Sequence, residues 1–203
     1  MELLFIEKEL KKRLQFPYRW GRKQQDSWDM QTGFIYKTPT FEELLSKTSH
    51  FSQDLKDYAF NRWYNFWSAV AVEWMFCNHE MVHPNPHKTD KLFDFKIGEL
   101  PFDHKTSVFP KGFGKSLEFA KENKAELIQW LYNNQSQEGR KHHKNRLFVV
   151  LFSNDGLHWK LKSELSLINE KVTEYLKGFN SDNLIQLDFP EGKVLSDIIF
   201  IEK

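Results

Sequence analysis

Several features that would fix the class of this 203-residue protein are scarce or missing, beginning with cysteine. The one cysteine, Cys77, cannot form an intramolecular disulfide, so a buried core must hold the fold, and a chain of this length can bury one. The N-terminal stretch MELLFIEKEL carries acidic residues where a signal peptide needs an unbroken apolar segment. These two features favour a cytoplasmic protein.

Long apolar runs and an excess of one charge are also missing. The longest apolar stretch, residues 66–76, is too short to span a bilayer and contains Glu73, so we expect no membrane partner. Lys and Arg number 29 against 28 Asp and Glu. This balance argues against a general polyanion-coating protein but is compatible with a locally basic groove.

Hydrophobic spacing predicts a mixed α/β protein without internal repeats. Residues 1–51 form a helical extension rich in aromatic and basic residues, in which Thr40 and Glu43 make a capping box. Residues 52–203 are expected to form one α/β unit. Its predicted helices begin near residues 52, 116 and 165, and its predicted strands include 146–153, 158–161, 184–189 and 194–201.

The stretch LFDFKIGELPFDHKTSV, residues 92–108, predicts a β-hairpin with acidic residues at unusual places. A two-residue loop at Gly98–Glu99 suits a tight turn that prefers glycine first. Counting outward from that loop places Asp94 directly opposite Asp103. Because side chains alternate along a strand, Lys105 then shares a face with both aspartates.

Two carboxylates at this spacing need a compensating charge. Opposed β-carbons lie roughly 4.5 to 5.5 Å apart, so ionised Asp94 and Asp103 repel each other. Mg²⁺ (or Mn²⁺) is an economical compensation, because it binds one or two carboxylates and leaves positions for water and phosphate. Lys105 can hold a phosphate oxygen or lower the pKa of an attacking water. The combination predicts phosphodiester hydrolysis.

Asp94 followed by Asp103-His104-Lys105 resembles the active-site signature of the PD-(D/E)xK nucleases, the restriction-endonuclease-like superfamily. The core of that family is a helix, a three-strand meander, a helix and a fourth strand, and residues 52–153 have a similar predicted order if residues 80–83 supply the first strand. The resemblance implies a mixed central sheet flanked by helices. Phe93 stands where the family signature has proline.

The same resemblance implies the roles of four residues and the class of substrate. Asp94 and Asp103 would bind the metal, Glu73 would add a ligand from the leading helix, and Lys105 would orient water or stabilise the transition-state charge. The implied activity is a Mg²⁺-dependent nuclease, with DNA a more favoured substrate than RNA. Such nucleases are often dimers, which leaves room for a homodimer.

Basic side chains supply candidate contacts to nucleic acid. Some are interleaved with aromatic residues that can stack on bases, and others crowd the loop before the apolar strand. The candidates are Arg19, Arg22, Lys23, Lys111, Lys115, Arg140, Lys141 and Lys144.

Four alternatives remain open at this stage. The hairpin aspartates could face solvent on an edge strand, neutralised by neighbouring lysines. A zinc site could use residues from the set Cys77, His79, His83, His87 and His104, although no zinc-binding motif is present. The segment GFGKS at 112–116 resembles part of a phosphate-binding loop but has Phe109 where the motif needs glycine. Finally, the fold could serve a non-catalytic nucleic-acid-binding or interaction module.

Overall fold

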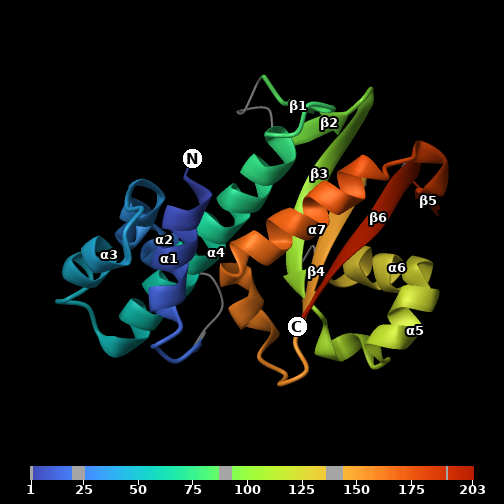
Figure 1. Ribbon diagram of the computed structural model, residues 1–203. Helices are drawn as coiled ribbons and strands as arrows, with labels where there is room; N and C mark the ends of the chain where they lie inside the picture. Colours follow the sequence, from blue (N-terminus) through green and yellow to red (C-terminus); the bar gives the residue numbers. More distant parts are fainter. Residues whose placement is uncertain (1, 20–25, 87–92, 136–143, 191) are drawn as a thin grey trace. The chain divides into compact units, whose positions relative to one another are not determined.

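A computed structural model describes residues 2–19, 26–86, 93–135, 144–190 and 192–203, and its fold is α/β with a six-stranded mixed sheet flanked by helices (Figure 1). The helices are α1 (Leu3–Arg13), α2 (Asp26–Gln31), α3 (Phe41–Lys47), α4 (Gln53–Cys77), α5 (Leu117–Glu122), α6 (Lys124–Gln135) and α7 (Leu165–Lys177), with 3-10 turns η1 (Gly33–Lys37), η2 (Lys111–Phe113), η3 (His158–Ser163) and η4 (Ser181–Asn183). The strands are β1 (Val82–Pro84), β2 (Phe95–Ile97), β3 (Leu100–Val108), β4 (Arg146–Phe152), β5 (Ile185–Phe189) and β6 (Gly192–Glu202). The predicted α/β class is therefore confirmed. Within the described ranges, no helix is both long and apolar enough to cross a bilayer.

The chain divides into two compact units. Unit 1 comprises Met1–Val72 and Lys162–Ser166, and unit 2 comprises Glu73–Leu161 and Leu167–Lys203. The boundary expected at residue 51 falls inside unit 1, which includes α4 as far as Val72.

Aromatic packing and buried arginines hold unit 1 together. The Trp63 ring lies 5.5 Å from that of Phe41, and its Nε1 donates to the carbonyl of Thr38 at 2.6 Å. Arg13 is fully buried and donates from Nη2 to Asn61 Oδ1 at 2.7 Å. A buried guanidinium requires such partners, since an unsatisfied charge would be costly. The predicted cap at Thr40 is confirmed, because its Oγ1 accepts from the main-chain N–H of the first turn of α3.

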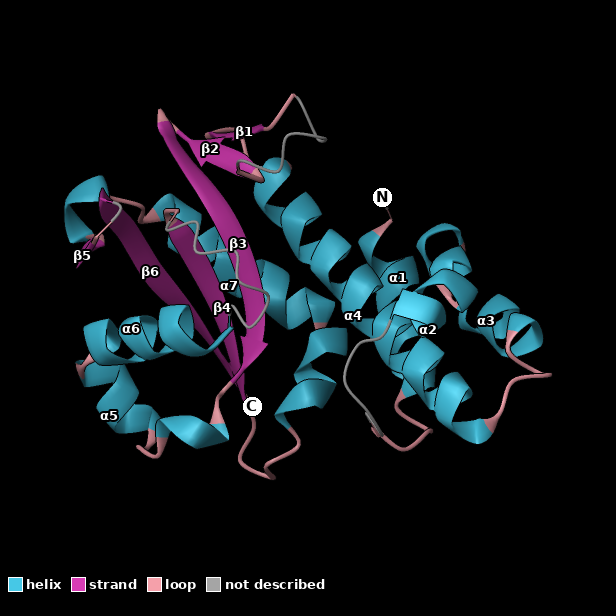
Figure 2. Cartoon of the chain, turned by 180° about the vertical axis from the view of Figure 1, so that it is seen from behind, coloured by secondary structure: helices cyan, strands magenta, loops and turns pink. Residues whose placement is uncertain are grey.

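The sheet of unit 2 has the strand order β1-β2-β3-β4-β6-β5. Strands β1, β2 and β3 form an antiparallel meander, β3, β4 and β6 run parallel, and β5 pairs antiparallel with β6 (Figure 2). The predicted register of the hairpin is confirmed from Phe95 to Phe102, since Ile97 pairs with Leu100 across a two-residue loop, but Asp94 precedes β2 and is not paired with Asp103 in the ladder. Gly98 has φ of 57°, a conformation that favours glycine.

Helices cover both faces of this sheet. Helices α5 and α6 lie on one face and α7 lies on the other, as the two opposite views show. Strand β4 has no exposed side chain from Leu147 to Leu151, which confirms the prediction of a central strand buried on both faces. The face under α6 is closed by Leu127, Ile128 and Leu131, all fully buried.

Two predicted elements differ from the structure. Residues 158–161, expected as a strand, form the start of η3 because the chain turns back after β4: His158 Nδ1 accepts from the N–H of Ser153 at 2.8 Å, and Gly156 has φ of 74°. The helix expected from 116 to 135 is interrupted at Asn123, whose side-chain amide donates to the Phe119 carbonyl at 2.9 Å. The main-chain N–H of Asn123 donates to the same carbonyl at 2.9 Å, but its φ of −125° and ψ of 51° are not helical, so α5 ends there and α6 begins at Lys124.

Candidate functional site

Three side chains of unit 2 come together where α4 ends beside the β2–β3 hairpin. Glu73 extends from the last turns of α4, Asp94 directly precedes β2, and His104 lies in β3. Each offers one ligand atom, and these three atoms lie within 4.8 Å of one another. The structure therefore brings Glu73 and Asp94 together, as predicted, and adds His104 to them.

The carboxylate of Asp94 is held by His104. Its Oδ2 accepts the main-chain N–H of His104 at 2.8 Å and lies 2.9 Å from His104 Nδ1. Burial raises the pKa of Asp94, but the hydrogen bonds and charge of His104 outweigh it and hold that pKa below its usual value. Asp94 is therefore an anion at neutral pH, as a metal ligand must be.

The imidazole of His104 has a fixed position. Its ring lies 6.1 Å from the ring of Phe76 on α4 and 6.2 Å from that of Phe95 on β2, and these two rings stack on each other at 4.7 Å. The His104 side chain is 7% exposed. Alternation along β3 explains this placement, because the buried Phe102 and His104 share one face of the strand.

Asp103 projects from β3 toward different partners. Its Oδ1 accepts from Lys105 Nζ at 3.0 Å, and its Oδ2 lies 3.3 Å from Arg146 Nε. Arg146 is the residue paired with Asp103 on the parallel strand β4, and its guanidinium lies 4.8 Å from the centre of the Tyr132 ring. Burial raises the pKa of Tyr132 to about 12, so the phenol stays neutral and donates to the Lys144 carbonyl at 2.6 Å.

The two hairpin aspartates thus have separate partners. This corrects the expectation that the repulsion between Asp94 and Asp103 needs a metal ion to compensate it. Their mutual repulsion is offset by the chain's own groups, His104 for Asp94 and Lys105 with Arg146 for Asp103. Among the described residues, the group that could hold a metal contains Asp94 but not Asp103. Proximity of Asp103 and Lys105 is as predicted.

Sequence reasoning considered His104 only for a zinc site and Arg146 only as part of a basic cluster, and it placed neither beside the hairpin aspartates. His104 could have been found from the alternation in β3, because its face is the one that packs against α4 and hence against Glu73. Arg146 follows from the pairing of β3 with β4, whose register is set by contacts distant in sequence. No local pattern reveals such a pairing.

The predicted nucleic-acid contacts are only partly described. Arg22, Lys23, Arg140 and Lys141 lie outside the described residues. Arg19 is exposed in unit 1, and its carbonyl accepts from the amide of Asn61. Lys144, the residue whose carbonyl binds Tyr132, is half-buried just before β4.

Lys111 and Lys115 are both exposed after the C-terminal end of β3. Four residues of extended strand separate His104 from the end of β3, or about 13 Å at the usual rise. Contacts from these lysines would thus fall on phosphates away from the candidate metal ligands.

The zinc and phosphate-loop alternatives find little support in the described contacts. Of the residues considered for zinc, His104 belongs to the group that could hold a metal, Cys77, His79 and His83 do not, and His87 lies outside the described residues. In the GFGKS segment, the Ser116 hydroxyl accepts from the Phe119 N–H at 3.1 Å and caps α5. That serine therefore has a structural role.

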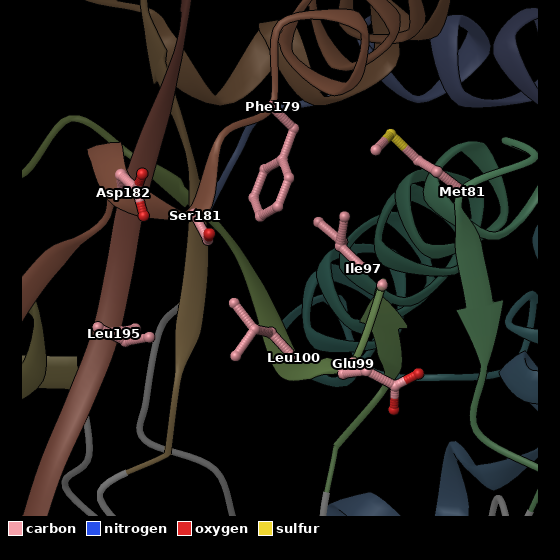
Figure 3. A pocket seen from close by; sticks show the side chains of 9 residues that line it. Met81, Ile97, Glu99, Leu100, Phe179, Ser181, Asp182 and Leu195 are labelled. Carbon is pink, nitrogen blue, oxygen red and sulfur yellow. The ribbon is translucent and has the colours of Figure 1, made fainter.

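A separate pocket of about 540 Å³ opens at the tip of the hairpin. Phe179 points between Ile97 and Leu100, and the carboxylate of Glu99 points away from them (Figure 3). None of the predicted catalytic residues lines this pocket.

The donor set of Glu73, Asp94 and His104 fits a divalent cation. It offers two carboxylates and one imidazole, from α4, from the residue before β2 and from β3, and the Asp94–His104 pair is already oriented by a main-chain hydrogen bond.

Comparisons of the chain with protein-family models, with curated proteins and with solved structures found no match.

Proposed function

We propose that this protein is a metal-dependent nuclease that hydrolyses phosphodiester bonds, with DNA as the favoured substrate. The observation that carries the proposal is the convergence of Glu73, Asp94 and His104. Asp103 and Lys105 flank His104 along β3, where side chains alternate to the opposite face, and the charge of Lys105 helps to lower the pKa of Asp94. Carboxylates that can hold a divalent cation, with a lysine within electrostatic reach, are groups that phosphodiester hydrolysis uses.

The order of elements supports the proposed likeness to the restriction-endonuclease-like core. Helix α4 is followed by the antiparallel meander β1-β2-β3, then by α5 and α6, and then by β4 parallel to β3. This is the order that the resemblance implied for residues 52–153. The acid of the leading helix, Glu73, also lies beside the first acid of the signature, Asp94.

Each side chain has a role in the proposed reaction. Glu73 and Asp94 would hold the cation, and His104 positions Asp94 through its two contacts with Oδ2. When bound, a divalent cation supplies an activated water and offsets charge on the phosphoryl oxygens. Lys105, with a side chain 45% exposed, can reach a substrate phosphate, while Asp103 and Arg146 fix the strand segment that carries it.

A non-catalytic nucleic-acid-binding module is the second candidate. It is favoured by one observation: both oxygens of Asp103 already have cationic partners within the chain. In such a module the aspartates would stabilise the hairpin, and replacing them would leave the salt dependence of nucleic-acid binding unchanged.

Cleavage of supercoiled plasmid and of single-stranded DNA, with Mg²⁺ or Mn²⁺, separates the two candidates. We expect Glu73→Gln, Asp94→Asn and Lys105→Ala each to lower the cleavage rate about 100-fold or more, a typical effect of losing a catalytic group. The matched control is Glu80→Gln, which removes an exposed acid and should retain activity. Cleavage that persists in chelator or in Asp94→Asn would refute the proposal.

A further inference from the structure

The geometry points to His104 as a direct ligand of the cation, and we propose that its imidazole makes the site select Mn²⁺ and Co²⁺ over Mg²⁺. This inference rests on the proposed function, because it names the metal of the same site. It follows from the separation of ligand atoms, from the chemistry of imidazole and from the fixed position of the ring.

The spacing of the two nearest ligand atoms fits one coordination sphere. His104 Nδ1 lies 2.9 Å from Asp94 Oδ2. Adjacent ligands of an octahedral ion are separated by about 3 Å when each bond is about 2.1 Å. A cation could therefore take the place of the proton between these atoms, with the ring proton on Nε2, while the main-chain N–H of His104 continues to bind Oδ2. Glu73 supplies a third ligand atom within 4.8 Å of the others.

The ring cannot easily leave this position. It packs near Phe76 and Phe95, and only 7% of the side chain is exposed. A ligand that is already ordered loses little conformational entropy when the ion binds. The imidazole is therefore pre-organised beside Asp94, and an ion bound by this carboxylate meets the nitrogen without rearrangement of β3.

One nitrogen ligand changes the preference among divalent cations. Mg²⁺ binds oxygen and usually keeps several waters, so an imidazole adds little to its affinity. Imidazole suits first-row transition metals, and affinity for a mixed nitrogen and oxygen site rises from Mn²⁺ to Co²⁺. A site made only of the two hairpin aspartates would lack this preference.

Metal binding can be measured without any substrate. Mn²⁺ binding would be followed by electron paramagnetic resonance, with Mg²⁺ as competitor, and Co²⁺ binding by visible absorption. We expect Mn²⁺ to bind at least about tenfold more tightly than Mg²⁺ to the wild type. In His104→Asn, whose amide can still donate to Asp94, Mn²⁺ affinity should fall at least about tenfold, because even the loss of a group that only orients a ligand typically costs about 10- to 100-fold. Mg²⁺ affinity should change less than about threefold, because Mg²⁺ prefers oxygen ligands.

Two further measurements keep the outcome decisive. Spin-echo modulation from a directly bound imidazole nitrogen should be present for Mn²⁺ on the wild-type protein, and this result does not depend on whether a variant folds. Asp103→Asn should retain Mn²⁺ binding. The inference would be overturned if the nitrogen modulation were absent. It would also be overturned if Asp103→Asn lost Mn²⁺ binding while His104→Asn kept it.

The failure of this inference differs from failure of the proposed nuclease. If DNA is cut but Mn²⁺ preference is independent of His104, the selectivity is wrong and the nuclease stands. If Mn²⁺ binds through His104 but neither DNA substrate is cut, the metal site stands and the nuclease is wrong.

Discussion

Replacing Lys162 with methionine should raise the stability of the protein at neutral pH. Lys162 lies in η3, half-buried, and its Nζ donates to Asn65 Oδ1 at 2.6 Å. In the described part of the chain, no carboxylate forms an ion pair with it. Burial lowers the pKa of its ammonium from 10.5 to about 8. The folded state therefore disfavours the charged form that prevails in the unfolded chain.

The magnitude follows from this difference in pKa. A difference of one pKa unit corresponds to about 1.4 kcal/mol. Because the pKa of Lys162 falls from 10.5 to about 8 on folding, keeping its side chain protonated in the folded state costs about 3 kcal/mol below pH 8. Between pH 8 and about 10.4 the unfolded state binds more protons, so the free energy of unfolding of the wild type rises with pH. Methionine keeps an unbranched side chain without the charge but leaves the Asn65 amide oxygen without its donor, which costs about 1 kcal/mol. We expect a net gain of about 2 kcal/mol at pH 7.

Urea unfolding followed by circular dichroism at pH 7, 8, 9 and 10 measures this effect. The difference between wild type and Lys162→Met should shrink as the pH rises through this range. Lys8→Met, which changes an exposed lysine of α1, controls for the general loss of a positive charge. A variant that is less stable at pH 7, or a difference that does not depend on pH, would show that the ammonium is not desolvated as its burial indicates.

Three other changes have expected outcomes. Asp94→Asn should remove a stabilising contribution that is present above about pH 4 and lost as the pH falls, because the pKa of the folded Asp94 is lowered; the acid limb of a pH-dependent thermal unfolding series should therefore flatten. Tyr132→Phe removes the hydrogen bond to the Lys144 carbonyl and should cost about 1 kcal/mol in urea unfolding, whereas an unchanged midpoint would mean that water replaces the bond. Phe148→Ala leaves a cavity in fully buried β4 and should cost about 3 to 5 kcal/mol by the same measurement; a loss under 1 kcal/mol would contradict the close packing under α6.

Local sequence patterns predicted the hairpin and β4 because the preferences of neighbouring residues determine both. The glycine at 98 set the turn, and the turn set the pairing of Ile97 with Leu100. The uninterrupted apolar run from Leu147 to Leu151 required burial on both faces, and β4 has it. The backbone preference of glycine thus determined the turn, and the cost of exposing apolar side chains to water determined the burial of β4.

The site was harder to predict because its contacts depend on long-range packing. Alternation correctly placed Asp103 and Lys105 on one face of β3, but it could not show that Arg146 would lie beside them on β4. The prediction also required Asp94 to be part of the regular strand. Asp94 instead precedes β2, and its carboxylate accepts the main-chain N–H of His104.

The charges around β3 bear on the class of phosphate that the proposed site would prefer. Glu73, Asp94 and Asp103 contribute three negative charges, and Lys105 and Arg146 contribute two positive charges. One net negative charge remains, which favours the entry of a cation.

With a divalent ion present, the net charge becomes one positive charge, and this matches the single negative charge of a phosphodiester. A phosphomonoester carries up to two negative charges at neutral pH and would leave one of them uncompensated in a half-buried site. The balance therefore favours an internal linkage of a nucleic acid over a terminal phosphate.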